Sequence, residues 1–117
     1  MKQTPISDRF NPDVLAIMPK NASRVVEVGC SSGALAKMYL QDSPGSEYIG
    51  IELVPEYASV AASACTRVIV DDIEKMDEGV FRALFPATCW VFADVLEHLY
   101  DPWSVLRRLR ASMAANE

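Results

Sequence analysis

The sequence predicts an α/β fold, in which an open parallel sheet is covered by helices on both faces. Three observations lead to this prediction. Short apolar runs alternate with segments of helical periodicity, a turn with two glycines follows the first run, and acidic residues stand at the ends of the first three runs. The composition agrees, since 50% of the 117 residues are hydrophobic and 23% are charged, as in an ordinary globular domain. We therefore expect one soluble domain.

The first half of the chain is expected to alternate helices and strands. A short helix is predicted to begin at Pro12, with Asn11 as its N-cap and Pro19 as its end. The segments expected after it are a strand at 24–28, a helix at 35–40, a strand at 47–53, a helix at 55–64 and a strand at 67–70. Right-handed crossovers between such strands produce a parallel sheet.

The second half is expected to continue this pattern less regularly. Residues 72–85 predict a loop and then a helical turn or two, which Pro86 ends. Residues 88–93 predict a fourth apolar strand. The pair Asp101-Pro102 predicts the start of a last helix, because an acidic N-cap followed by proline is a typical helix beginning.

The two ends of the chain are expected to differ from the domain between them. Residues 1–11 show no periodic apolar pattern, so we expect a mobile N-terminal arm ahead of a single domain at residues 12–117. The sequence stops at Glu117 where a further strand would follow, and we expect the domain to be truncated there. The fourth strand would then form an exposed sheet edge, which favours self-association by strand pairing.

Charge, cysteine usage and hydropathy argue against several classes of function. The net charge of −5 disfavours binding to nucleic acid or to an anionic membrane. The three cysteines have no paired spacing, so we expect neither a disulfide framework nor a metal site, and the reducing cytoplasm is the expected compartment. No apolar run approaches the roughly 20 residues that span a bilayer, and the N-terminus lacks the apolar core of a signal peptide.

Acidic residues at the strand ends indicate a ligand that carries hydrogen-bond donors. In an open parallel sheet, ligands bind beyond the carboxyl ends of the strands. Glu27 is expected within the first turn, Glu52 closes the second strand, and Asp72 follows the third. A nucleoside offers ribose hydroxyls and an exocyclic amine, which carboxylates accept. Gly29 and Gly33 fit such a site, because glycine lets the turn bend sharply and lie close to a ligand.

The glycine turn alone is compatible with more than one kind of protein. It occurs in dinucleotide-binding domains, in other nucleoside-binding enzymes, and as a purely structural turn. An NAD-type site is disfavoured, because Ser31 stands where the second glycine of that fingerprint approaches the pyrophosphate and the turn holds no Arg or Lys. A P-loop is excluded, since no Gly-Lys-Ser/Thr follows.

Four segments of the sequence stand out as ordered motifs. They are Val-Glu-Val-Gly-Cys-Ser-Ser-Gly at 26–33, Ile-Gly-Ile-Glu at 49–52, Asp-Ile-Glu at 72–74 and Asp-Val-Leu-Glu-His-Leu-Tyr-Asp-Pro at 94–102. In this order they resemble the motifs of class I S-adenosylmethionine-dependent methyltransferases. The last segment resembles the small-molecule branch of that family. The resemblance implies S-adenosyl-L-methionine as cofactor, a small-molecule methyl acceptor, and a Rossmann-like doubly wound sheet of about four parallel strands in the order 3-2-1-4, without the later strands of the full fold.

The resemblance also implies which residues hold the methionine part of the cofactor. Backbone groups of Gly29 and Cys30 would contact it, and Glu27 would support its amino group. Ala93 and Asp94 would border the methionine and face the methyl acceptor. The full set of expected cofactor-binding residues is Glu27, Gly29, Cys30, Ser31, Gly33, Glu52, Leu53, Asp72, Ile73, Ala93 and Asp94.

The same resemblance assigns the nucleoside part to the second and third strands. Glu52 would hold the two ribose hydroxyls, with Leu53 beside the adenine. Asp72 would accept a hydrogen bond from the adenine amine, and Ile73 would flank the ring. Two alternatives stay open: His98, the only histidine, is either a general base or a structural residue, and the chain is either a methyltransferase or a non-catalytic cofactor-binding module.

Overall fold

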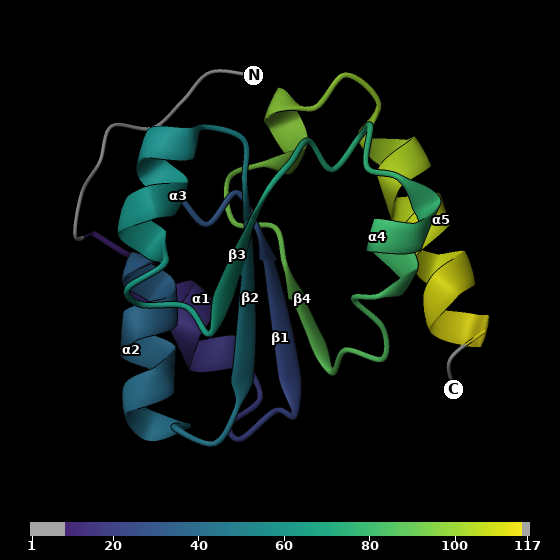
Figure 1. The fold of residues 1–117 in the computed structure, drawn as a ribbon. Helices are drawn as coiled ribbons and strands as arrows, with labels where there is room; N and C mark the ends of the chain where they lie inside the picture. Colours follow the sequence, from purple (N-terminus) through teal and green to yellow (C-terminus); the bar gives the residue numbers. More distant parts are fainter. Residues whose placement is uncertain (1–8, 116–117) are drawn as a thin grey trace.

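The computed structural model describes residues 9–115, so most of the expected N-terminal arm, residues 1–8, lies outside the described residues. The described chain alternates helices and strands, as the sequence predicts (Figure 1). Its elements in chain order are α1 (Pro12–Ile17), β1 (Arg24–Val28), α2 (Ala34–Asp42), β2 (Glu47–Glu52), α3 (Pro55–Ala61), β3 (Arg67–Val70), α4 (Glu78–Arg82), β4 (Cys89–Val91), the 3₁₀ helix η1 (Leu96–His98) and α5 (Pro102–Ala115).

The four strands form one parallel sheet in the order β3-β2-β1-β4, which confirms the predicted fold class and strand order. β1 pairs with β2 along its whole length, from Arg24 opposite Glu47 to Val28 opposite Ile51. β3 pairs with β2 up to Glu52. The carboxyl ends of β1, β2 and β3 therefore reach the same edge of the sheet, where the connecting loops gather at the top of Figure 1.

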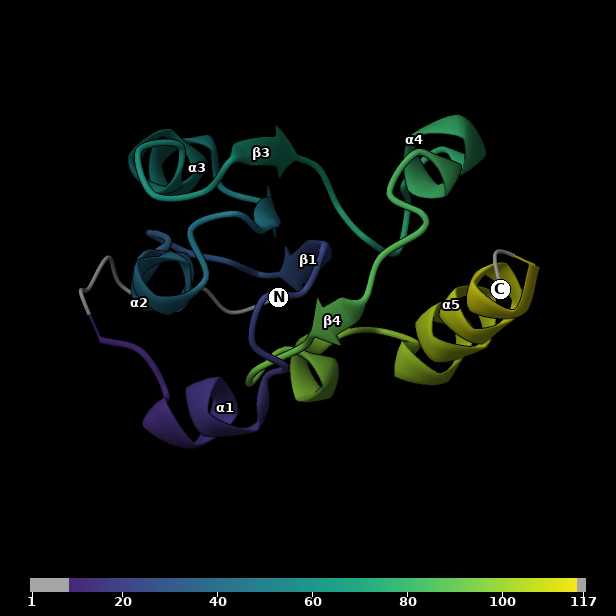
Figure 2. The ribbon, with the colours of Figure 1, turned by 90° about the horizontal axis from the view of Figure 1, so that it is seen from below.

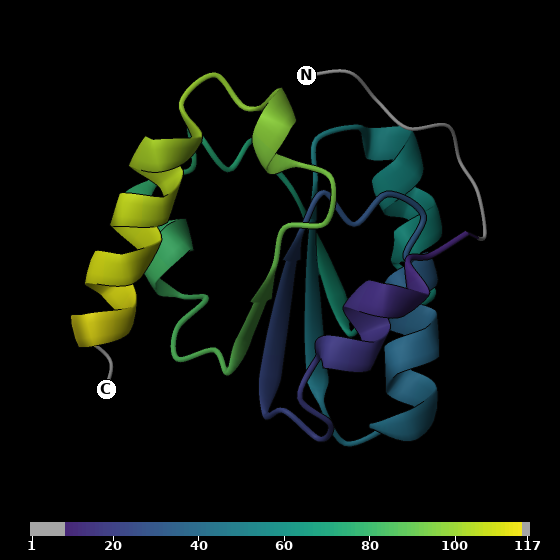
Figure 3. The ribbon, with the colours of Figure 1, turned by 180° about the vertical axis from the view of Figure 1, so that it is seen from behind.

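Helices cover both faces of the sheet. Seen along the strands, α1, α2 and α3 lie on one side and α4 and α5 on the other (Figure 2), and α1 lies beside α2 (Figure 3). Adjacent residues of one strand serve opposite faces, as the strand period of two requires. Val25 belongs to the buried cluster under α1–α3, while Val26 belongs to the cluster under α4 and α5.

Two predicted helix starts are confirmed by their caps. The Asn11 side chain accepts hydrogen bonds from Asp13 N and Val14 N at the beginning of α1, with Pro12 in the first turn. The Asp101 carboxylate accepts from Ser104 N, at 3.1 Å, at the beginning of α5. Each cap satisfies backbone donors that have no partner within the helix.

Several predicted elements are longer than the observed ones. The strand expected at 88–93 is only Cys89–Val91, because its pairing with β1 ends at Val91; Asp94 then has a φ of 54°, outside the extended region. The helix expected at 55–64 ends at Ala61, and residues 62–64 close two further turns with i to i+3 hydrogen bonds. β3 is also less buried than expected, since Val70 at the sheet edge is 53% exposed.

Two structural features are absent from the described part of the chain. Within residues 9–115, no helix has both the length and the apolar character that a bilayer crossing requires. The same part of the chain holds no group of three or more His, Cys, Asp and Glu side chains placed to bind a metal ion.

Candidate nucleoside site at the strand ends

The turn after β1 depends on both of its glycines. Gly29 and Gly33 have φ values of 74° and 85°, which favour glycine strongly. A Cβ atom on Gly29 would lie 2.7 Å from Val95 Cγ2, and one on Gly33 would lie 3.1 Å from Ala61 Cα. The turn therefore fits tightly between the loop after β4 and helix α3. Ser31 also has a left-handed conformation, with φ of 51°.

Glu52 links this turn to the end of β2. Glu52 is 2% exposed, and its carboxylate accepts hydrogen bonds from Ser31 N at 2.8 Å and from Val54 N at 3.0 Å. The turn is also fixed by Gly29 N and Cys30 N, which both donate to Ile51 O. Each Glu52 oxygen has a second lone pair, so the carboxylate has acceptor capacity left for a ligand.

Glu27 lies inside β1 and not within the turn, which corrects the sequence prediction. Its side chain is buried and accepts a 2.7 Å hydrogen bond from the Tyr48 hydroxyl. Burial raises the pKa of Glu27 from 4.5 to about 7; the hydrogen bond from Tyr48 opposes this rise, and the nearby Glu52 carboxylate adds to it. Glu27 is thus poised to take up or release a proton near neutral pH.

Tyr48 is a site residue that sequence reasoning missed. It lies opposite Val25 in the β1–β2 register, while Glu27 lies opposite Gly50. Residues two apart on one strand share a face, so Tyr48 and Glu27 project from the same face of neighbouring strands. The signal in the sequence was a tyrosine two residues before a strand glycine, but its use requires the register.

Cys30 is packed as a structural thiol within the turn. A Cβ atom on Gly50 would lie 2.6 Å from Cys30 Sγ and 3.1 Å from Cys65 Sγ, so both sulfur atoms sit directly over this glycine. A hydrogen bond with Cys65 and burial raise the pKa of the Cys30 thiol, which keeps it protonated and a poor nucleophile. Backbone contact with a ligand, as expected from the sequence, remains the role open to Cys30.

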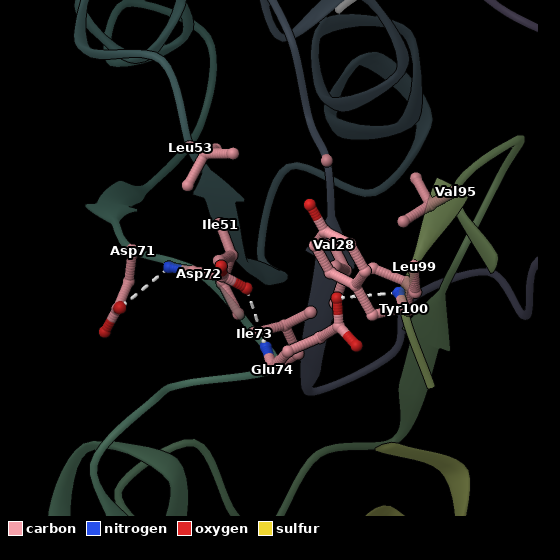
Figure 4. Close-up of a pocket in the computed structure, with 11 residues that line it drawn as sticks. Val28, Ile51, Leu53, Asp71, Asp72, Ile73, Glu74, Val95, Leu99 and Tyr100 are labelled. Atoms are coloured by element: carbon pink, nitrogen blue, oxygen red, sulfur yellow. Dashed lines mark hydrogen bonds between the residues drawn. The ribbon is translucent and has the colours of Figure 1, made fainter. Parts of the chain in front are cut away.

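A pocket opens beside the turn, between the ends of β1–β3 and the segment around η1 (Figure 4). Its volume is about 460 Å³, counting the part that is open to solvent. Most of its walls are apolar, and its acidic groups lie along the loop after β3. The lining residues are Val28, Gly29, Ile51, Leu53, Asp71, Asp72, Ile73, Glu74, Val95, Leu99 and Tyr100. An apolar pocket with a few polar groups at one side is typical of a small-molecule site.

The loop after β3 is ordered by its own acidic side chains. Asp71 Oδ1 accepts from Asp72 N at 2.7 Å, and Asp72 Oδ1 accepts from Glu74 N at 2.9 Å. The Glu74 carboxylate then accepts from Tyr100 N at 3.1 Å and from Asp101 N at 2.9 Å. Glu74 thereby joins the two loops that border the pocket, as the dashed bond in Figure 4 shows for Tyr100.

The structure brings part of the predicted site together. Gly29, Leu53, Asp72 and Ile73 line the pocket. Five other predicted residues do not line it; these are Glu27, Cys30, Ser31, Gly33 and Glu52.

The predicted residues after β4 do not line this pocket, although their neighbours Val95 and Leu99 do. Neither Ala93 nor Asp94 lines it, and Asp94 is exposed. His98 lies on η1 with its side chain 39% exposed, and its Nε2 atom is 3.5 Å from Glu97 Oε1. His98 also does not line the pocket. A general-base role for His98 therefore stays a prediction.

Comparison with known proteins agrees with this geometry. The family described as "Methyltransferase domain" matches residues 26–116. The chain is similar to the solved N-terminal domain of EvdMO1 with SAH bound, at 27% identity and a TM-score of 0.62, over 74% of this chain and 37% of that one. No curated protein matches.

Two further solved structures share the fold at lower identity. One is CalS10 with SAM bound, an amino pentose methyltransferase from Micromonospora echinaspora, at 21% identity and a TM-score of 0.59, over 89% of this chain and 42% of that one. The other is the plantazolicin methyltransferase BpumL in complex with SAH, at 15% identity and a TM-score of 0.66, over 78% and 35%. The chain thus spans less than half the length of these proteins.

Proposed function

The chain belongs to the methyltransferase-domain family, and on that premise we propose that it binds S-adenosylmethionine and serves methyl transfer to a small molecule. The observation that carries the proposal is the pocket at the strand ends, where Asp72, Ile73 and Leu53 meet beside the turn that Glu52 holds. This is the place where an open parallel sheet binds nucleosides.

The pocket residues fit an adenosine. Leu53, Ile73 and the other apolar walls would cover the faces of an adenine ring. Asp72 Oδ1 is occupied by Glu74 N, whereas Asp72 Oδ2 accepts no hydrogen bond from any residue between 9 and 115. Oδ2 is therefore available to an exocyclic amine. Glu52, with a lone pair left on each oxygen, would accept from the two ribose hydroxyls.

The turn and Glu27 would serve the amino-acid end of the cofactor. The buried Glu27 carboxyl has no cationic residue beside it within the segment 27–33. A ligand ammonium group would supply the missing positive charge, directly or through water, and would favour the ionised form of Glu27. Tyr48 keeps the carboxyl oriented through its 2.7 Å hydrogen bond.

Bound S-adenosylmethionine supplies an electrophilic methyl group on a sulfonium. The contribution of this chain is to hold that group still and to align it for in-line attack, which is the larger part of the catalysis expected for such a transfer. Ala93 and Asp94, on the loop after β4, are the residues we assign to the acceptor side. His98 is the candidate base for an acceptor that must lose a proton.

Calorimetry with S-adenosylhomocysteine tests the binding proposal directly. We expect wild-type chain to bind it, and we expect Glu52→Gln and Asp72→Asn to bind roughly ten- to a hundredfold more weakly, since each loses charge-assisted hydrogen bonds. Glu56→Gln, on the exposed start of α3, is the matched control and should bind like wild type. Binding of NADH in place of S-adenosylhomocysteine would overturn the proposal.

A non-catalytic cofactor-binding module is the second candidate function. It is favoured by one observation: His98 and Asp94 lie outside the pocket, and a binding module needs neither. Transfer of a radiolabelled methyl group to a panel of small nucleophiles separates the two candidates. Turnover that His98→Ala reduces would reject the non-catalytic module, whereas tight cofactor binding without turnover by the whole protein would support it.

Two properties of the protein outside the site complete the proposal. The described cysteines are all free thiols, which agrees with the reducing cytoplasm as its compartment. Among residues 9–115, β4 pairs on one side only, with β1, and it is three residues long. We propose that its unpaired edge supports self-association, and light scattering over a concentration series that shows only monomer would refute this.

A further inference from the structure

Tyr100 occupies an unusual position at the mouth of the pocket. It is 91% exposed, yet it is one of the residues that line the pocket. Figure 4 shows its ring extended over the pocket, opposite the side that carries Leu53 and Asp72. Within residues 9–115 this ring contacts no other aromatic ring. One face of the phenol is therefore available to whatever enters the pocket.

The backbone at Tyr100 is held in place from across the pocket. Glu74 Oε1 accepts from Tyr100 N at 3.1 Å, and Glu74 Oε2 accepts from Asp101 N at 2.9 Å, so one carboxylate fixes two consecutive peptide groups. Glu74 is itself fixed, because its own N–H donates to Asp72 Oδ1. The half-buried Leu99 next to Tyr100 packs against the core cluster under α4 and α5.

We propose that Glu74 is a positioning residue that holds Tyr100 over the nucleoside pocket, where the phenol ring stacks on the adenine. This inference rests on the proposed function, since it assumes an adenine in the pocket. The ring then covers one face of the base, and the apolar side chains of Leu53 and Ile73 cover the opposite side. Stacking on an aromatic side chain needs only a flat face, so an exposed tyrosine suffices.

The hydrogen bonds from Asp72 through Glu74 to Tyr100 connect the residue that would bind the adenine amine with the residue that would stack on the adenine ring. Asp72 uses Oδ1 to hold Glu74 N, and Glu74 uses both oxygens to hold the Tyr100 segment. The carboxyl that we assign to the adenine amine therefore also sets the position of the residue that covers the ring. A ligand that orders Asp72 would order Tyr100 with it.

Calorimetry with S-adenosylhomocysteine on side-chain variants tests the stacking role. We expect Tyr100→Ala to bind about tenfold more weakly than wild type. The binding free energy of stacking on an exposed ring lies near the low end of the range for base–aromatic contacts. Tyr100→Phe keeps the ring and should restore wild-type affinity. Trp103→Ala removes a different aromatic residue, 69% exposed and outside the pocket, and should have no effect.

A second ligand locates the effect on the adenosine end. 5′-Methylthioadenosine carries the same adenine but lacks the amino-acid end. Tyr100→Ala should weaken its binding by the same factor as that of S-adenosylhomocysteine. A loss confined to S-adenosylhomocysteine would overturn the proposal, because it would place Tyr100 at the amino-acid end.

A double-mutant cycle tests the positioning role of Glu74. We expect Glu74→Ala to weaken S-adenosylhomocysteine binding in the wild-type background and to have no further effect in the Tyr100→Ala background, because it acts through that ring. Asp101→Ala weakens the start of α5 but leaves both Glu74 contacts, since these go to backbone N–H groups, and it should leave affinity unchanged. Glu74→Gln, which retains one acceptor oxygen, serves if Glu74→Ala does not fold.

The outcomes separate this inference from the function on which it rests. Wild-type chain that fails to bind S-adenosylhomocysteine refutes the proposed function. Wild-type chain that binds, with Tyr100→Ala binding equally well, refutes the stacking role alone. Equal losses from Glu74→Ala in both backgrounds would show that Glu74 acts on the site independently of Tyr100 and would overturn the positioning role.

Discussion

Replacement of Glu27 by glutamine should stabilise the protein at alkaline pH and leave it little changed at acidic pH. Glu27 is buried in β1, and its pKa rises from 4.5 to about 7, chiefly through burial. Between these two values the folded chain binds a proton that the unfolded chain has released. The free energy of unfolding of the wild type therefore falls as the pH rises through this range and does not recover above it. Glutamine has no charge to bury and still offers Tyr48 an acceptor oxygen.

The size of the effect follows from the two pKa values of Glu27. One pKa unit corresponds to about 1.36 kcal/mol, so the complete shift costs the folded state about 3 kcal/mol when the carboxyl is ionised. At pH 5 most of this cost is absent because the folded carboxyl is still protonated. Between pH 5 and pH 8 the difference in stability between Glu27→Gln and wild type should therefore grow by about 2.5 kcal/mol.

Urea unfolding at several pH values, without ligand, measures this difference directly. The subtraction removes the contributions of all other titrating groups, because they are common to the two proteins. Glu56→Gln, exposed on α3, controls for the loss of an acidic residue and should give a small and nearly constant difference. A Glu27→Gln difference that also stays constant from pH 5 to pH 8 would refute the argument, since Glu27 would then be ionised at no cost.

Three further predictions follow from other contacts. Gly29→Ala should lower the free energy of unfolding by about 2–4 kcal/mol. The new Cβ would lie 2.7 Å from Val95 Cγ2, and alanine would have to adopt the φ of 74° that Gly29 has. Gly45→Ala, where a Cβ meets nothing within 4 Å, should change it by less than about 0.5 kcal/mol, and equal effects would contradict this comparison. Asp101→Ala should cost about 1 kcal/mol in urea unfolding through loss of the α5 cap, and an unchanged midpoint would contradict it. Calorimetry at pH 7 in buffers of different ionisation enthalpy should detect release of about half a proton from Glu27 when S-adenosylmethionine binds. If Glu27→Gln releases the same amount, Glu27 is not the source of the proton.

The sequence predicted the fold well because burial imposes a pattern on it. β1 and β3 have the predicted bounds, since each is a short β-branched run between clear turn residues. The error at the fourth strand arose from a different cause. Residues 92 and 93 are as apolar as a strand requires, but the pairing of β4 with β1 ends at Val91, and the chain adopts a left-handed conformation at Asp94. The apolar periodicity of a sequence indicates which face of a strand is buried, but it does not predict where the backbone leaves the sheet.

The sequence predicts individual residues of the candidate site but not the contacts between residues that are far apart in the chain. Gly29 and Asp72 were predicted from the turn and the strand ends, and Leu53 and Ile73 from the family resemblance; all four line the pocket. The contact between Glu74 and Tyr100 joins residues 26 positions apart on two different loops, and no local pattern encodes it.

The contact between Tyr48 and Glu27 depends on register in the same way. It requires that Val25, and not a neighbour, lie opposite Tyr48. A shift by one residue would place the hydroxyl on the other face of the sheet. Contacts across the sheet and between loops therefore had to come from the structure.

The electrostatics of the strand ends argue for a cationic ligand independently of the motifs. Glu27 and Glu52 lie on neighbouring strands, and the charge of Glu52 raises the pKa of Glu27. Glu52 is stabilised by two backbone N–H groups, whereas Glu27 has the Tyr48 hydroxyl and no Lys or Arg in the turn beside it. Ionisation of the buried Glu27 carboxyl lowers the free energy of unfolding as the pH rises from about 4.5 to about 7, and this loss persists above pH 7. A ligand that carries both ribose hydroxyls and a positive charge would relieve this cost, and a neutral nucleoside would not.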